Sequence, residues 1–130
     1  MTHTSKDLQE RTKAFALRVL RVFQSIPESR EGRILGQQLL RAATSVAANY
    51  RAACRARSTR DFISKLGIVE EEADECLFWL EFLADAGIVE AMKLKDLLSE
   101  ASQLTAIFVA SRRTAKNNNR QSEIANRKFS

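Results

Sequence analysis

The sequence predicts an all-α protein, an antiparallel up-down four-helix bundle. The 130 residues include one proline and four glycines, which favours helices over turns and strands. Apolar residues recur at three- and four-residue spacing in four successive stretches. The links between these stretches are short and polar, so consecutive helices are expected to be antiparallel neighbours. A chain of this length buries a core without disulfides.

The first two helices are separated by the only proline. The first is predicted to start near Ser5, with Asp7 in its first turn, and to end before Pro27. Residues 28–32 are predicted to be a loop. The second helix is predicted over residues 34–57, with apolar side chains over about half of its circumference. This apolar arc is wider than one bundle seam requires.

The third and fourth helices complete the bundle. Ser58 followed by Asp61 resembles a capping box and predicts a helix that ends at Gly87, a suitable C-terminal cap. The fourth helix is predicted from residue 90 or 94 to residue 115. Residues 116–130 lack periodicity and contain three consecutive asparagines, which predicts a basic, flexible tail. The chain therefore divides into a bundle domain, 1–115, and a tail, 116–130.

The third helix carries a second apolar group outside its core stripe. Ile68, Phe78, Trp79 and Phe82 lie roughly 120° to 200° from that stripe on a helical projection. Exposed aromatic residues at this density are typical of protein interfaces. We expect these four residues to form an oligomer interface.

Charge is unevenly distributed along the chain. Residues 32–60 contain six arginines and no acidic residue, whereas residues 61–100 contain eleven acidic residues and three basic ones. The basic residues have two interpretations: they contact the phosphates of a nucleic acid, or they are neutralised by acidic residues of the third helix. The candidate nucleic-acid-binding residues are Arg33, Arg41, Arg51, Arg55, Arg57, Arg60, Arg112, Arg113 and Lys116, and the tail adds Arg120, Arg127 and Lys128. No aromatic residues alternate with them, so any binding would favour backbone or shape over base sequence.

Little in the sequence indicates catalysis. The one histidine is His3, near the start of the chain, and no nucleotide-binding or nucleophile motif is present. We predict no enzyme activity, no cofactor, no metal and no small-molecule substrate. Cys54 and Cys76 are expected to be buried, reduced thiols. Glu72 lies at the edge of the core stripe, and we expect it to hydrogen-bond Asn49 or Arg41 as a structural polar group.

The chain has no apolar run that would span or insert into a membrane. Its first ten residues are polar and lack the apolar core of a signal peptide. We therefore expect a cytoplasmic protein without a membrane partner.

Two motifs resemble a known family. Gln38, Leu39, Arg41, Ala42, Ala43, Ser45 and Asn49 match a pattern of the second helix in the four-helix bundle proteins also called ribosomal RNA intervening-sequence proteins. Phe62, Glu72, Ala73, Asp74, Glu75, Trp79, Leu80 and Glu81 match its continuation in the third helix. The resemblance covers about residues 10–110. Where many members have a glutamate soon after the asparagine, this chain has Ala48, Tyr50 and Arg51, so the local charge is reversed.

The resemblance implies a ring-shaped homo-oligomer, commonly a homopentamer. Relatives include the accessory variability proteins of diversity-generating retroelements, which bind nucleic acid and a reverse transcriptase. The family supplies no catalytic residues. The sequence thus favours a non-enzymatic bundle that binds structured RNA or a nucleic-acid–protein complex, with a reverse transcriptase as one candidate partner. The alternative is a structural or adaptor protein that binds another protein and has no nucleic-acid role.

Overall fold

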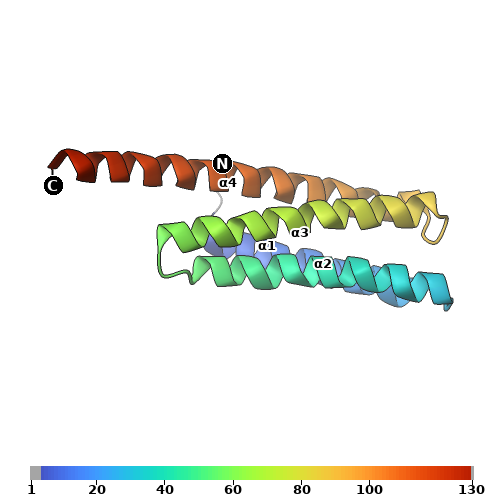
Figure 1. Cartoon of the computed structure of the whole chain (residues 1–130). Coiled ribbons are helices and arrows are strands. Elements are labelled where there is room, and N and C mark those ends of the chain that lie inside the picture. The colour runs from blue at the N-terminus through green and yellow to red at the C-terminus, as the bar shows by residue number, and fades with distance from the viewer. Residues whose placement is uncertain (1–3, 130) are drawn as a thin grey trace.

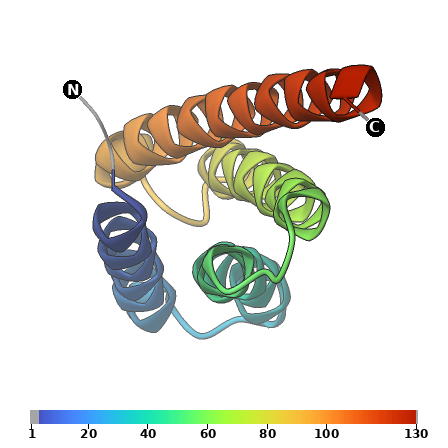
Figure 2. The same ribbon diagram turned by 90° about the vertical axis from the view of Figure 1, so that its left-hand side faces the viewer.

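Four antiparallel helices form the protein, as the sequence predicts. The computed structural model describes residues 4–129, and its helices are α1 (Ser5–Ser25), α2 (Arg30–Cys54), α3 (Thr59–Asp85) and α4 (Ala91–Phe129). Helix α2 packs against α1 and α3, and α4 packs against α3 and, less extensively, against α1 (Figures 1 and 2). No helix in residues 4–129 is both long enough and apolar enough to cross a membrane.

Side-chain caps fix where the first three helices begin. Thr4 caps α1, one residue earlier than expected, and forms a capping box with Asp7. Ser29 caps α2 by accepting a hydrogen bond from the Gly32 amide at 2.9 Å, so the predicted loop over 28–32 is wrong from residue 30 onward. Helix α2 also ends at Cys54, three residues before its predicted end.

Helix α3 follows its prediction closely. Ser58 caps it by accepting from the Asp61 amide at 3.0 Å, and the helix stops at Asp85. Gly87 then adopts a φ of +72°, a left-handed conformation that suits glycine and reverses the chain toward α4.

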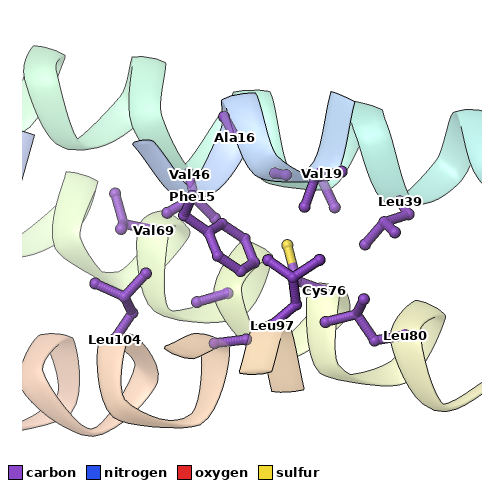
Figure 3. Packing of buried hydrophobic residues seen from close by; sticks show 14 of the residues in the cluster. Phe15, Ala16, Val19, Leu39, Val46, Val69, Cys76, Leu80, Leu97 and Leu104 are labelled. Atoms are coloured by element: carbon purple, nitrogen blue, oxygen red, sulfur yellow. The ribbon is translucent and has the colours of Figure 1, made fainter. Parts of the chain in front are cut away.

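The core runs along the centre of the bundle and takes side chains from all four helices. Phe15 of α1, Val46 of α2, Cys76 of α3 and Leu104 of α4 converge there (Figure 3). These four residues are essentially inaccessible to solvent. Burial of this apolar surface is the main source of stability.

Two glycines let the end of α1 approach the start of α2. A Cβ atom placed on Gly36 would lie 2.9 Å from Cδ2 of Phe23 and 3.0 Å from Cδ1 of Ile26. A Cβ atom on Gly32 would lie 2.9 Å from Cγ2 of Ile26. The close approach of the two helices therefore depends on the missing side chains.

The seam between α1 and α4 is sparse and is joined by one ion pair. Arg11 donates to both carboxylate oxygens of Glu100, at 2.8 Å and 2.7 Å, and to Gln103 at 3.0 Å. The bidentate geometry is the favourable one for a guanidinium and a carboxylate. This pair lowers the pKa of Glu100, mainly through the hydrogen bond from Arg11.

The prediction of an irregular tail is not what the structure shows, because α4 continues to Phe129. The helix projects beyond the end of the bundle at which α2 ends and α3 begins (Figure 1). From residue 120 to residue 128 every side chain is exposed. The asparagine run is a weak helix former, but a preformed α4 removes the cost of helix nucleation for the residues that follow. Flexibility of residues 116–129 stays a prediction.

Alanine substitutions at two helical glycines should change stability in opposite directions. Gly67→Ala should raise the free energy of unfolding by about 0.5–1 kcal/mol, because its Cβ would find its nearest neighbour, Arg112, at 3.9 Å and the helix gains rigidity. Gly36→Ala should lower the free energy of unfolding by about 1 kcal/mol. The added methyl group would overpack the contact with α1, and this cost exceeds the gain in helix rigidity. Urea denaturation measures both, and equal stabilisation would disprove the close packing at Gly36.

The Arg11–Glu100 pair should make stability fall in acid. A carboxyl group whose pKa is lowered by folding stabilises the native state above its unfolded pKa, and that contribution disappears as the pH falls through the folded pKa. The free energy of unfolding should therefore decrease as the pH falls below about 4.3, the ordinary pKa of glutamate. The decrease should be less steep in Glu100→Gln than in the wild type. Glu90→Gln, an exposed change, is the control and should leave the slope unchanged.

Candidate nucleic-acid interface

The nine basic residues predicted to bind nucleic acid do not form one surface. Two of them are held in ion pairs with α3, one lies at the far end of α2, and six remain near the end of the bundle from which α4 projects. The structure thus separates residues that the sequence presented as one set.

Arg41 belongs to a network that joins α2 to α3. Its Nη2 atom lies 2.5 Å from Oε1 of Glu75, and its Nη1 atom lies 3.5 Å from Oε2 of Glu72. The indole of Trp79 donates to the same Glu75 oxygen at 3.2 Å. The hydrogen bond with Glu75 raises the pKa of Arg41, and the bond from Arg41 is the largest cause that lowers the pKa of Glu75. The ion pairs of Arg41 therefore lie within the bundle, which makes its guanidinium less available to a phosphate.

Glu72 is the polar group of this network that is least well satisfied. Burial, and then the neighbouring Glu75 carboxylate, raise the pKa of Glu72, although Arg41 opposes the shift. Its Oε2 atom is buried without a hydrogen bond, with the Arg41 guanidinium at 3.5 Å as its nearest charge partner. Of the two partners expected from the sequence, the structure shows Arg41, and it shows no hydrogen bond between Glu72 and Asn49.

Arg112 makes the equivalent connection between α4 and α3. Its Nε and Nη2 atoms donate to the two carboxylate oxygens of Glu70, at 2.6 Å and 3.4 Å. The hydrogen bond raises the pKa of Arg112. This arginine is half-buried and is also committed to the bundle.

Arg33 lies apart from the others. Eighteen residues separate it from Arg51 in the sequence, which corresponds to roughly 27 Å along α2. A single compact nucleic-acid site cannot include both ends of the helix.

The remaining basic residues gather where α2 ends and α3 begins. Because Arg112 lies opposite Glu70 in antiparallel helices, Lys116 lies level with Leu66 and Arg120 level with Phe62, close to the start of α3. Two acids at this end have other partners: Asp61 pairs with Lys65 at 3.0 Å, and Asp7 caps α1. Arg51, the sixth of the remaining candidates, lines a groove between α1 and α2. We call the other five, together with Arg120 of the predicted tail, the basic end; it comprises Arg55, Arg57, Arg60, Arg113, Lys116 and Arg120.

The expected oligomer-interface residues lie on the outer face of α3. Ile68, Phe78 and Phe82 are 45%, 54% and 41% exposed, whereas Trp79 is half-buried against α2. The ring centroids of Phe78 and Trp79 are 4.9 Å apart, and those of Phe78 and Phe82 are 5.9 Å apart. The aromatic residues therefore support one another as an ordered cluster. Their role in assembly stays a prediction.

The groups with potential reactivity are separate from these surfaces. Cys76 is buried, and desolvation raises the pKa of its thiol to about 12, so the reactive thiolate is disfavoured at neutral pH. Cys54 is only half-buried, contrary to expectation, and both cysteines are free. His3 lies outside the described residues. Within residues 4–129 no three histidine, cysteine or acidic side chains are arranged to hold a metal.

Basic residues of α1 belong to a surface that the sequence did not indicate. Lys6 and Lys13 border a groove between α1 and α2, together with Arg51 and Arg55 of α2. The sequence places them off the core stripe of the first helix, but helical periodicity alone does not show which neighbouring helix they face.

The fold and these surfaces define a helical bundle with a cationic end and an exposed aromatic face. A model of the 23S rRNA-intervening sequence protein family matches residues 5–110, and the chain belongs to this family. The chain is similar to the crystal structure of a protein of unknown function from the S23 ribosomal protein family of Bacteroides thetaiotaomicron. The two are 26% identical, with a TM-score of 0.75, over 80% of this chain and 96% of that one. No similarity to a curated protein was found.

The family motifs noted in the sequence meet at the α2–α3 seam. Arg41 comes from the first motif, and Glu72, Glu75 and Trp79 come from the second. These motif residues connect two helices of one subunit. The motifs are therefore explained by the fold and do not by themselves indicate a ligand.

Loss of Arg41 should cost stability, whereas loss of Arg51 should not. Arg41→Gln leaves the buried Oε2 atom of Glu72 and the neighbouring Glu75 without their cation, and the free energy of unfolding should fall by about 1 kcal/mol. Arg51→Gln is the matched control on the same helix, since Arg51 makes no ion pair with a described residue. Equal stability of the two variants in urea denaturation would show that the network is unimportant.

Proposed function

We propose that this protein is a non-enzymatic, homo-oligomeric helical bundle that binds structured RNA through its basic end. The observation that carries the proposal is the group of exposed cations near the start of α3, which have no acidic partner among the described residues. These cations suit the phosphates of a helical RNA better than unstacked bases, because Phe62, the ring level with Arg120, is half-buried and offers little surface for stacking.

The helical extension of α4 supports this choice of surface. Lys116 and Arg120 lie on the part of α4 that runs alongside the first turns of α3, and Arg57 and Arg60 lie in the α2–α3 connection and in the first turn of α3. Cations on two elements offer a wider contact than one helix does. The family description names the intervening sequence of 23S rRNA, which makes a ribosomal stem-loop the natural first probe.

Two parts of the proposal rest on the family resemblance. The proposed oligomer is a ring, with a homopentamer favoured, and a reverse transcriptase is one candidate protein partner. Co-purification of the tagged protein with a reverse transcriptase encoded beside it would support that partner. The absence of catalytic activity agrees with a sequence whose one histidine is at position 3.

An adaptor that binds another protein is the second candidate. It is favoured by the ion pairs of Arg41 and Arg112, which remove two arginines from the RNA set, and by the exposed aromatic cluster of α3. The two candidates differ in one property: only the first requires salt-dependent binding of RNA.

Charge reversal at the basic end should weaken RNA binding without unfolding the protein. The double variant Arg57→Glu and Arg60→Glu should bind a stem-loop RNA at least about tenfold more weakly in moderate salt, because attraction to the phosphates becomes repulsion. The dependence of log Kd on log salt should become shallower by about one for each phosphate that the variant no longer binds. Fluorescence anisotropy across a salt series measures both effects.

The control applies the same charge change at the opposite end of the bundle. Lys93→Glu with Lys95→Glu alters two exposed lysines near the start of α4 and should leave affinity nearly unchanged. Equal weakening by both double variants would indicate a nonspecific effect of net charge and contradict a site at the basic end. No binding by the wild type at low salt would leave the adaptor role as the better interpretation.

A further inference from the structure

The outer surface between α1 and α2 is an open apolar groove of about 980 Å³. Its apolar lining comes from both helices. One of the lining residues, Leu17, is an exposed leucine that does not belong to the core. The apolar residues of the groove are Ala16, Leu17, Leu20, Leu40, Ala47 and Ala48. The wide apolar arc of the second helix is accounted for here, because its core side faces the bundle while Leu40 and Ala47 line this groove.

The rim of the groove is cationic. The groove is lined by five cations, against one acidic residue, Glu10: Lys6 and Lys13 of α1, and Arg41, Arg51 and Arg55 of α2. Arg41 pairs with Glu72 and Glu75, whereas the other four cations form no ion pair with a residue in the described part of the chain. An occupant of this groove should therefore be apolar in its centre and acidic at its edges.

The outer face of α3 has this chemistry. Ile68, Phe78 and Phe82 form an exposed apolar ridge, and the contacts between the aromatic rings keep it ordered. Four acidic residues that are exposed and lack ion pairs within residues 4–129 lie along the same helix face: Glu71, Asp74, Glu81 and Asp85. We call this surface the acidic ridge.

We propose that the acidic ridge of one copy of this chain occupies the α1–α2 groove of another copy. The two surfaces match in polarity, since each has an apolar centre, and they are opposite in charge. Pairing of two ridges would bring like acidic charges together, and pairing of two grooves would do the same with cations. Repulsion therefore disfavours both symmetric arrangements.

Pairing of two different surfaces has a consequence for assembly. Each copy that binds through its ridge still offers an empty groove, so the contact repeats from subunit to subunit. Such a contact gives a ring when the rotation between neighbours closes and an open filament when it does not, and the proposed ring requires closure. The inference deepens the self-association that forms part of the proposed function, and it does not depend on RNA binding. It also assigns Arg51 and Arg55 to the subunit contact. Arg55 is the one residue shared with the basic end, whose other five cations stay available for RNA.

A mixing experiment tests which surfaces meet. The ridge variant carries Phe78→Asp and Phe82→Asp, and the groove variant carries Leu17→Asp and Arg51→Glu; all four positions are exposed, so the bundle should still fold. Circular dichroism checks folding. Met92→Asp, a change at an apolar residue that is 79% exposed and lies outside both surfaces, is the control and should assemble as the wild type does.

Light scattering should show an oligomer for the wild type and monomers for each variant alone. An equimolar mixture of the two variants should form a dimer of about twice the 14.7 kDa chain mass, because one intact groove can meet one intact ridge and no further subunit can add. A mixture that stays monomeric, or a groove variant that still assembles by itself, would overturn the pairing.

The same samples separate this inference from RNA binding. A monomeric wild type would refute self-association, whatever its affinity for RNA. A wild type that assembles as described but fails to bind the stem-loop RNA would leave the pairing intact and refute the RNA part of the proposed function.

Discussion

The ion-pair network of Arg41 with Glu72 and Glu75 is the constraint on which the α2–α3 seam depends. It joins the two antiparallel helices at the edge of the core, and the short chain that connects them holds them in the register that brings these side chains together. The indole of Trp79 donates a hydrogen bond to the Glu75 carboxylate, which orients the indole against the rings of Phe78 and Phe82 on α3. A polar contact at the edge of the core thus sets the geometry of a surface outside it.

The helices could be predicted from the sequence because their signals are local. Ser58, Asp61 and Gly87 act within a few residues of their own positions, and the apolar stripes need only the period of the helix. The errors have the same origin. Ser29 caps a helix from within a polar stretch that resembles a loop, and the helicity of residues 116–129 depends on a helix already formed upstream, which no short window of sequence reveals.

The candidate site was harder to predict because it depends on partners distant in sequence. Arg41 and Arg51 are both arginines on the outward side of one helix, yet only Arg41 lies opposite acidic residues of α3. Likewise, Lys13 and Arg55 border one groove although more than forty positions separate them. A sequence gives the side of a helix on which a charge lies, but the packing of helices decides which charges meet.

The basic residues of this fold are of two kinds: those that form ion pairs within the subunit, and those that have no acidic partner. An ion pair inside the subunit holds each arginine to one rotamer and reduces its attraction for anions, so Arg41 and Arg112 contribute little to binding. The cations without an acidic ion-pair partner, at the groove and at the basic end, attract anions more strongly. Since the two surfaces share only Arg55, assembly through the groove would neutralise the groove cations and leave the other cations of the basic end exposed. A ring built in this way would repeat the basic end once per subunit, and several moderate phosphate contacts on one RNA bind more tightly than any single one.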